Sequence, residues 1–267
     1  MREITSLRNP ALRRYRDLRD PAARRASGLA AAEGFNLLRE ALLSDVELVQ
    51  VFLGERARRR PDFEEISARL AAGESAGHWE CFAVHGELLE RVAHTESPQG
   101  ALAVFRPRAF SLGDVTAGDG PVLLLDRVAD PGNLGLIVRT AEAAGCAGIV
   151  LSPGTVDPLN PKCVRASAGS VFRLPAAHAD LASAAAALEA KGWRLFATSP
   201  RGGLEYSAAD LRGRVGLLLG QEGAGLSPEL LGRFEGLRIP TGRVESLNVA
   251  MAAGVLLYEA RRQRGAG

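Results

Sequence analysis

The sequence predicts an α/β protein in which a small α/β domain precedes a larger domain built on a parallel sheet. Helix-like and strand-like segments alternate along the chain, which is typical of α/β folds. In the second half, unbroken apolar runs suit parallel strands buried on both faces; they occur at residues 122–125, 148–151, 194–197 and 215–219. An irregular, glycine-containing stretch at 107–119 predicts a linker between domains at 1–106 and 120–267.

The first hundred residues contain the elements of the small domain. Asn9 can cap a helix with Pro10 in its first position, and Leu12, Tyr15 and Leu18 then repeat as one apolar stripe. Further helices are expected at 33–43, 63–70 and 88–92, and strands at 48–53, 81–84 and 101–105.

The second domain has helical segments between its apolar runs. They are expected near 134–144, 162–172 and 181–191, and a last helix runs from Ser246 to about Arg262. In such a sheet, ligands collect at the carboxyl ends of the strands.

Composition excludes several classes of protein. With 267 residues, 46% of them hydrophobic and 24% charged, the chain can bury a core and is not mainly disordered. No apolar run is long enough to span a bilayer, and residues 1–5 carry no apolar signal segment. Cys81, Cys146 and Cys163 form no C-x-x-C pair, which argues against disulfides and thiolate zinc and favours a cytoplasmic protein. No metal site is expected, because none of the four histidines lies in a motif. The histidines are His78, His85, His94 and His178.

Positive charge is concentrated at the start of the chain. The formal net charge is only +2, from 33 basic and 31 acidic residues. Yet arginines within residues 1–25 far outnumber the acids there; they are Arg2, Arg8, Arg13, Arg14, Arg16, Arg19, Arg24 and Arg25. Arg13, Arg14, Arg16 and Arg19 fall mainly opposite the apolar stripe, so this helix face is either solvated or directed at a polyanion. The general preference for arginine suits phosphate contacts and equally suits a GC-rich genome.

Three segments place small or polar residues directly after a buried strand. The first, DRVADPGNLG at 126–135, leads into a helix that carries Arg139; alone, it is explained by a helix cap and a surface arginine. The second, GQEGAGLSP at 220–228, is neither G-x-G-x-x-G nor a P-loop. A tight turn before a capped helix explains its Ser227 and Pro228 but not Glu222, whose carboxylate could bind nucleoside hydroxyls or amines.

The third segment, IPTGRVESLN at 239–248, precedes the last helix. Ser246 is well placed as a helix cap, and free amides there can hold a carboxylate or phosphate. Asn248 in the first turn can donate and accept hydrogen bonds at once.

Together the three ordered segments resemble the motifs of the SpoU class (TrmH-like) of the SPOUT superfamily of RNA methyltransferases. VDP at 156–158, PK at 161–162 and RASAG at 165–169 also resemble family positions. The part before the linker resembles the small L30e-like substrate-binding domain that is often fused to such enzymes. The residues that carry this resemblance are ITS at 4–6 with Asn9, Glu33-Gly34 and SPQG at 97–100. Gln221 departs mildly from the usual smaller residue, and the loop near Thr241-Gly242 is one residue shorter than the family pattern.

The resemblance implies an enzyme that methylates a ribose 2′-OH of RNA with S-adenosyl-L-methionine, on a parallel sheet whose C-terminal segment forms a deep trefoil knot. The implied cofactor contacts are Thr198 and the turn after it, Gly220, Gln221, Glu222, Gly223, Ile239, Pro240, Ser246, Leu247 and Asn248. Arg139 is the implied catalytic arginine, with Asn133, Glu222, Ser246 and Asn248 orienting it and the ribose. Because a guanidinium stays charged, positioning the RNA and stabilising a developing alkoxide suit Arg139 better than acting as a base. RNA contacts are expected from Arg8, Arg13, Arg14, Arg16, Arg139 and Arg165.

The implied substrate is ribosomal RNA, hence a role in rRNA processing, with tRNA as the alternative; the reason is the added N-terminal domain. A homodimer through the knot is also implied. The apolar side of the last helix could form the dimer interface; its residues are Val249, Ala252, Ala253, Leu256 and Leu257. The alternative is that this helix is an ordinary core helix. Other hypotheses are a non-catalytic RNA-binding protein that kept the fold, disfavoured by the intact motifs, and a related base methyltransferase, disfavoured by Ser246-Leu247-Asn248. A role in antibiotic resistance through rRNA methylation stays open.

Overall fold

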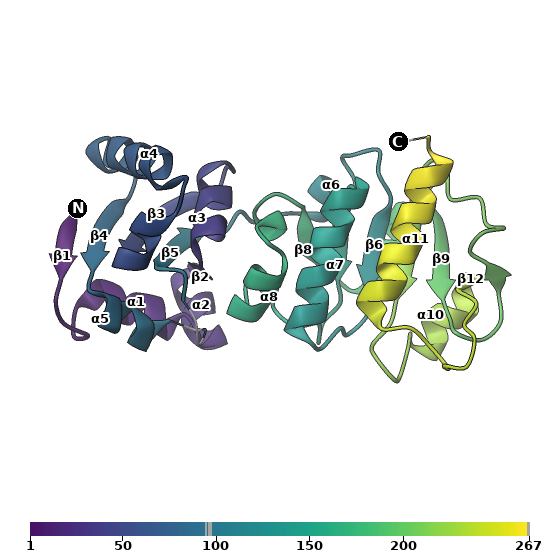
Figure 1. The fold of residues 1–267 in the computed structure, drawn as a ribbon. Coiled ribbons are helices and arrows are strands. Elements are labelled where there is room, and N and C mark those ends of the chain that lie inside the picture. Colours follow the sequence, from purple (N-terminus) through teal and green to yellow (C-terminus); the bar gives the residue numbers. More distant parts are fainter. Residues whose placement is uncertain (94, 96–97, 266–267) are drawn as a thin grey trace. The chain divides into compact units, whose positions relative to one another are not determined.

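The computed structural model describes residues 1–93, 95 and 98–265, which form two compact units (Figure 1). The first unit consists of Met1–Arg108 and Leu159–Arg173, and the second of Ala109–Pro158 and Leu174–Gly267. The chain therefore leaves the second unit after Pro158, contributes an inserted segment to the first, and returns. His94 and Ser97, considered above, lie outside the described residues.

A five-stranded mixed sheet forms the centre of the first unit. Its order is β1 (Arg2–Ile4), β4 (Glu80–Val84), β3 (Glu47–Leu53), β5 (Ala101–Arg106) and β2 (Ala30–Glu33). Strand β5 is antiparallel to both neighbours, and the other pairs are parallel. The helices are α1 (Pro10–Asp17), α2 (Pro21–Ser27), α3 (Phe35–Leu42), α4 (Phe63–Ser75), α5 (Gly86–Val92) and α8 (Pro161–Ala166), with 3-10 turns η1 (Glu55–Arg59) and η2 (Ser170–Phe172).

Each face of this sheet buries its own core, because side chains alternate along β5. On one face, Leu12 and Tyr15 of α1 are fully buried, and the Tyr15 ring meets Phe52 edge to face at 6.1 Å. On the other face, the inserted segment completes the core, with the Phe172 ring 5.1 Å from Phe105. The apolar stripe predicted on the first helix is confirmed, and its Asn9 cap accepts from the Ala11 amide at 2.9 Å.

The second unit contains a seven-stranded sheet in which every pair is parallel, as the unbroken apolar runs predict. Its order is β10 (Leu204–Glu205), β12 (Glu235–Arg238), β9 (Arg194–Thr198), β11 (Val215–Leu219), β6 (Val122–Leu125), β7 (Gly148–Leu151) and β8 (Ala176–His178). Strand β11 thus lies between β9 and β6, and is buried along its whole length.

Helices of the second unit are α6 (Leu112–Val115), α7 (Pro131–Ala144), α9 (Leu181–Glu189), α10 (Pro228–Arg233) and α11 (Val249–Gln263). Helices α7 and α11 lie side by side (Figure 1). Helix α6 falls within the stretch expected as a linker. It begins with a capping box formed by Ser111 and Asp114. In the part of the chain that the structure describes, no helix combines the length and apolar character needed to cross a membrane.

Three sequence expectations about helix ends are wrong. The last helix begins at Val249, and its cap is Asn248 rather than Ser246, because the Asn248 Oδ1 accepts from the Ala250 and Met251 amides at 2.9 and 3.4 Å. The helix expected at 162–172 is two short turns, since Ala168 and Gly169 both have positive φ. The helix expected at 33–43 begins only at Phe35, because Glu33 pairs with β5.

Candidate active site

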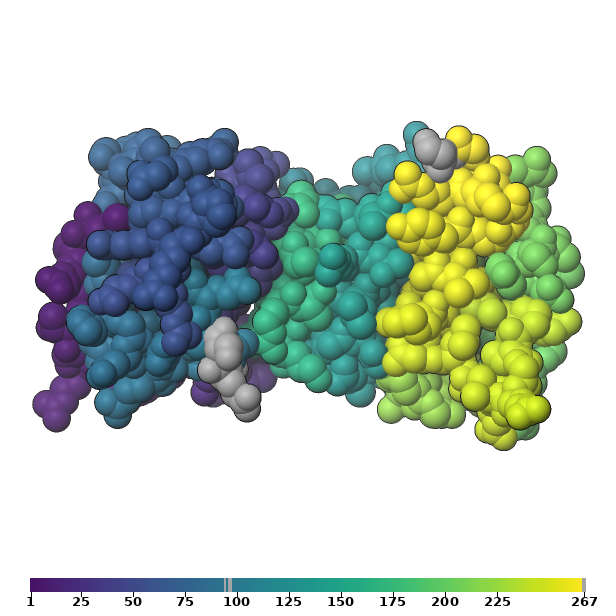
Figure 2. All heavy atoms as spheres, in the orientation of Figure 1, coloured from purple at the N-terminus to yellow at the C-terminus, as the bar shows by residue number. Residues whose placement is uncertain are grey.

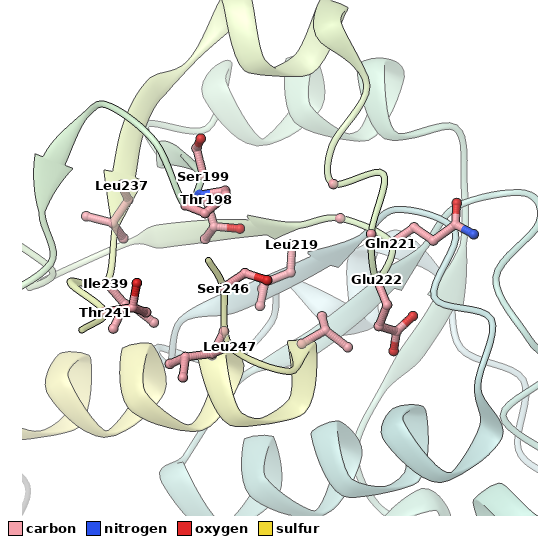
Figure 3. A pocket seen from close by; sticks show the side chains of 16 residues that line it. Thr198, Ser199, Leu219, Gln221, Glu222, Leu237, Ile239, Thr241, Ser246 and Leu247 are labelled. Carbon is pink, nitrogen blue, oxygen red and sulfur yellow. The ribbon is translucent and has the colours of Figure 1, made fainter. Parts of the chain in front are cut away.

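A cavity of about 140 Å³ opens where strands β9, β11 and β12 end (Figure 3). Each strand supplies residues from the turn that follows it, and the loop before α11 closes the remaining side. The lining residues are Thr198, Ser199, Pro200, Leu219, Gly220, Gln221, Glu222, Gly223, Gly225, Leu237, Ile239, Thr241, Ser246, Leu247, Val249 and Ala252. This is the edge at which ligands of parallel sheets bind.

The turn after β11 requires glycine for a steric reason. A Cβ on Gly220 would lie 2.0 Å from the carbonyl carbon of Gly225, so only glycine lets the turn fold back on itself. The turn is held by the Gly225 amide, which donates to the Gln221 carbonyl at 2.8 Å. In Figure 3, the Gln221 side chain points away from the other labelled residues, so at this position the backbone lines the cavity.

The lining combines apolar walls with a polar rim. Leu219, Leu237 and Ile239 are apolar, whereas Thr198 and Glu222 bring a hydroxyl and a carboxylate. The Thr198 hydroxyl donates to the Leu218 carbonyl at 2.8 Å, which fixes its rotamer. Apolar walls accept an aromatic base, and the polar rim suits ribose hydroxyls or an amino group. The residues present therefore fit S-adenosylmethionine.

A row of hydrogen bonds links the three sequence motifs beside the cavity. The Asn248 amide nitrogen donates to the Asn133 Oδ1 at 3.2 Å, and the Asn133 amide nitrogen donates to the Glu222 Oε1. The direction is set from both ends: backbone amides of α11 require the Asn248 oxygen as acceptor, and the Glu222 carboxylate can only accept. Each side chain is thereby held in one orientation.

A buried carboxylate supports the loop that precedes α7. Asp126, only 6% exposed, follows β6 and accepts from the Arg127 Nε and Nη2, each at 3.0 Å. It also accepts from the Ser227 amide at 3.3 Å, which ties the first motif to the second. Arg127 has a φ of 55°, a strained conformation for a residue with a side chain, so these interactions hold an unusual turn in place.

The structure brings together most of the residues predicted for this site. The cavity is lined by Thr198, Gly220, Gln221, Glu222, Gly223, Ile239, Ser246 and Leu247, while Asn248 and Asn133 adjoin it through the hydrogen-bonded row. Pro240 is not among the lining residues. Arg139 is exposed on α7, and no interaction between described residues joins it to the row.

Ser199 and Pro200, which form the predicted turn after Thr198, also line the cavity. Other lining residues were not predicted from the sequence. The apolar residues carry no comparable signal; they are Leu219, Leu237, Val249 and Ala252. Among the described residues, no three His, Cys, Asp or Glu side chains gather as metal ligands would.

The arginines predicted to contact RNA lie in the first unit, apart from Arg139. Arg8 precedes α1, Arg13, Arg14 and Arg16 are exposed on it, and Arg165 is exposed on α8. Arg24 is different: it is 3% exposed, and its guanidinium donates to the carbonyls of Leu18 and Arg19, each at 3.0 Å. One of the N-terminal arginines therefore closes the end of α1 rather than facing a ligand.

A parallel α/β sheet whose strand ends carry a cavity with glycine-rich walls, a hydroxyl and a carboxylate defines a protein that binds a nucleotide-like cofactor. Residues 120–258 match the model of the SpoU rRNA Methylase family, and residues 9–103 match the MRM3-like substrate binding domain. The chain belongs to the SpoU rRNA methylase family. The predicted enzyme class, an S-adenosylmethionine-dependent RNA methyltransferase, is thereby confirmed.

Relatives resemble this chain over nearly its whole length. It is 32% identical over 263 residues to the 23S rRNA (guanosine(2553)-2′-O)-methyltransferase RlmP of Bacillus subtilis, covering 98% of this chain and 100% of RlmP. The AdoMet-bound rRNA methyltransferase of Sinorhizobium meliloti is 35% identical, with a TM-score of 0.86 over 98% of this chain and 97% of that one. The SpoU methyltransferase AviRb of Streptomyces viridochromogenes, in complex with AdoMet, is 28% identical. Its TM-score is 0.83, and the match covers 97% of this chain and 100% of AviRb.

Proposed function

We propose that the protein transfers a methyl group from S-adenosylmethionine to a ribose 2′-OH of ribosomal RNA. The observation that carries this proposal is the hydrogen-bonded row Asn248, Asn133 and Glu222, which joins three separate motifs at the mouth of the cavity. The names of relatives favour rRNA over tRNA, since RlmP acts on 23S rRNA.

The cofactor would be held by the cavity residues Thr198, Gly220, Ile239 and Leu247. When bound, it supplies a methyl group already activated on a sulfonium. The chain's own residues then have to bring the hydroxyl into line, exclude water and assist loss of its proton. Asn133 and Glu222 are fixed in single orientations for this purpose, and Arg139 positions the RNA and offsets the developing alkoxide charge.

We infer that Arg139 completes the site of a second copy in a homodimer. Arg139 is exposed on α7, where Leu136, three residues earlier, is 39% exposed, and the neighbouring helix α11 exposes Met251 at 57% and Tyr258 at 52%. Figure 2 shows the teal and yellow surfaces of the second unit next to each other, in keeping with the packing of α7 on α11. An apolar face of this kind is typical of an interface.

Most of the residues first considered for that interface are buried within the chain itself. Val249, Ala253, Leu256 and Leu257 are at most 7% exposed, which favours the alternative of an ordinary core helix for these four. Ala252 is half-buried and lines the cavity.

Methyl transfer from labelled cofactor to purified total rRNA and to tRNA tests the function. Label is expected in rRNA, and nuclease mapping should place it on a ribose 2′-oxygen. Arg139→Ala should abolish transfer, whereas Arg139→Lys should retain a fraction, because a positive charge remains without the planar fork. Label on a base with a free 2′-OH, or unchanged turnover by Arg139→Ala, would contradict the proposal.

A reducing compartment, the cytosol, fits the state of the cysteines. Cys81, Cys146 and Cys163 are free and buried. Burial raises the pKa of the Cys81 thiol to about 11 and that of Cys146 to about 12. Both thiols are therefore protonated at neutral pH and resist disulfide exchange.

A further inference from the structure

A second cavity, of about 360 Å³, lies in the first unit, where β2 ends and α3 begins, beside the inserted segment. Its lining residues are Glu33, Gly34, Asn36, Leu37, Arg39, Glu40, Thr95, Gln99, Arg165 and Ala168. Two of the motifs that the methyl-transfer site does not use, Glu33-Gly34 and the Gln99 region, meet here. The volume falls within the range of about 300–1,000 Å³ that is usual for small-molecule sites.

The lining offers hydrogen-bond groups of every kind. Glu33 can only accept, Arg39 and Arg165 can only donate, and the amides of Asn36 and Gln99 can do both. Such a set matches the mixed donor and acceptor edge of a nucleobase, and it does not match a simple ion. A phosphate is disfavoured as the occupant of the interior because the Glu33 carboxylate would repel it.

Glu33 is held in place by buried partners. It is only 8% exposed and accepts from the Thr95 amide at 3.2 Å and from the Tyr15 hydroxyl at 3.4 Å. Burial, together with the charge of Glu33, raises the pKa of Tyr15 well above its usual value, so the phenol stays a donor. Burying a carboxylate this far from water costs free energy unless hydrogen bonds compensate it, and Tyr15 and Thr95 donate such bonds here.

Close packing of the inserted segment on α3 builds one wall of the cavity. Gly169 has a φ of +95°, and a Cβ there would lie 2.6 Å from the Cβ of Glu40, so a larger residue would push the segment away. Arg173 fixes the same segment through an ion pair with Glu40 at 2.9 Å. This attachment presents the exposed Arg165 at the rim, where, among the described residues, it forms no ion pair.

We propose that this cavity holds one unpaired base of the RNA substrate, guanine, whose N1–H and N2 amino group place two donors side by side on its pairing edge. Glu33 would accept from those donors, Asn36 and Gln99 would read neighbouring groups, and Arg165 would contact the adjoining phosphate. Recognition of splayed-out bases by side chains is the usual route to sequence-specific RNA binding. The inference rests on the proposed function only in taking RNA as the ligand.

Nucleotide titration of the full-length protein tests the cavity directly. The cofactor site is first saturated with S-adenosylhomocysteine, and GMP, CMP, AMP and UMP are then added separately to ¹⁵N-labelled protein. GMP should shift the backbone amide of Gly34 and the side-chain amides of Asn36 and Gln99, and the other three nucleotides, which lack its pair of adjacent donors, should shift them less. A stronger response to CMP, AMP or UMP than to GMP, or none to any nucleotide at millimolar concentration, would overturn the assignment.

Kinetics of variants provide the second test. Glu33→Gln replaces an acceptor with a donor in the same shape and should raise the KM for rRNA about tenfold, with kcat and cofactor affinity unchanged. Glu65→Gln, the same change on the exposed face of α4, is the matched control and should leave the KM unaltered. Gln99→Trp fills the rim of the cavity from an exposed position, so its KM remains informative should Glu33→Gln fold poorly.

The two proposals fail separately. Active methyl transfer with an unchanged KM in Gln99→Trp would overturn the base cavity and leave the methyltransferase intact. Nucleotide shifts at Gly34 without methyl transfer to any RNA would contradict the proposed activity and leave the cavity standing.

Discussion

Asn248 serves two structural purposes with the two ends of one amide group. Its oxygen caps α11 by accepting from the Ala250 and Met251 amides, and its nitrogen donates to Asn133 beside the cavity. The start of α11 and the orientation of Glu222 are therefore coupled through Asn133.

Two substitutions of Asn248 separate these purposes. Asn248→Asp keeps the cap but loses the donor, so we expect an unchanged melting temperature and a kcat about a hundredfold lower. Asn248→Ala loses both, at a cost of about 1 kcal/mol for the cap, and should also melt about 2–4 °C lower. Calorimetry and methyl-transfer kinetics on the same preparations measure both effects. Full activity in Asn248→Asp would show that the hydrogen bond to Asn133 has no part in positioning.

At the scale of single residues, the sequence predicts where the site lies better than how it is bonded. Strand-end position pointed to Glu222 and Ile239, the family resemblance added Thr198, and the structure brings all three to one cavity. Ser246 was wrongly predicted as the helix cap, because serine and asparagine are both good caps and nothing local separates them. The choice between them is decided by the second donor of Asn248, whose partner Asn133 is far away in the chain.

Hydrogen bonds of Gln263 hold the carboxyl-terminal end of α11 in place, and the Glu259 carboxylate orients the Gln263 side chain. The Gln263 side chain accepts from the Leu211 amide at 2.8 Å and donates to the Ala209 carbonyl at 2.9 Å. Glu259 accepts from Gln263 at 2.8 Å and from Arg262, whose hydrogen bond lowers the pKa of Glu259 to about 2.

This lowered pKa predicts a pH-dependent contribution to stability. Because the pKa is lower in the folded chain than in the unfolded one, the stabilisation is complete above about pH 4.5 and is lost as the pH falls towards about 2. Glu259→Gln should therefore melt below wild type at pH 7, and the difference should shrink below pH 4.5. Thermal unfolding from pH 7 to pH 3 measures it, with Glu245→Gln, a 90% exposed carboxylate, as control. A difference that does not change with pH would rule out this ionic contribution.

Helix α1 has an exposed basic face whose residues can be substituted without changing the buried core. Arg13, Arg14 and Arg16 are exposed, whereas Leu12 and Tyr15 are fully buried. The triple change of these arginines to glutamate should weaken RNA binding and make its salt dependence shallower, by about 0.7–0.9 in log–log slope for each phosphate that is no longer neutralised. Cofactor affinity should be unchanged, because the cavity lies in the other unit.

Filter binding at several salt concentrations measures this slope. Arg69→Glu, on the exposed face of α4, is the control for a change of net charge alone. An unaltered slope in the triple variant would mean that the α1 face is merely solvated, as exposed basic helices often are.

At the scale of elements, those with internal periodicity were predictable and those created by pairing were not. Helices α7 and α9 and the central strands follow from their apolar patterns. Strand β2 contains three alanines, which have low strand propensity, and it is extended because it pairs with β5. The short strands β1, β8 and β12 likewise depend on a partner from elsewhere in the chain.

At the scale of the whole molecule, the first unit is not a contiguous stretch of sequence. Leu159–Arg173 arrives from the second half of the chain and buries Val164 and Phe172 in the core around Phe35 and Phe105. Nothing local marks this, because the insertion is defined by contacts between residues far apart in sequence. Composition shifts reveal linkers, but they cannot reveal an insertion of this kind.

The insertion predicts that residues 1–108 alone fold poorly. Without Val164 and Phe172, the Phe105 face is left uncovered, and the loss of one buried phenylalanine ring alone costs about 3–5 kcal/mol. We expect this fragment to bind a hydrophobic dye and to unfold without a sharp transition. Joining residues 159–173 to it through a flexible glycine–serine linker should restore cooperative unfolding, and the same fusion carrying Phe172→Ala should not. Equal urea midpoints for the fragment and the fusion would contradict this prediction. Since Arg165 and Ala168 also line the proposed base cavity, the restored fusion should regain nucleotide binding together with its fold.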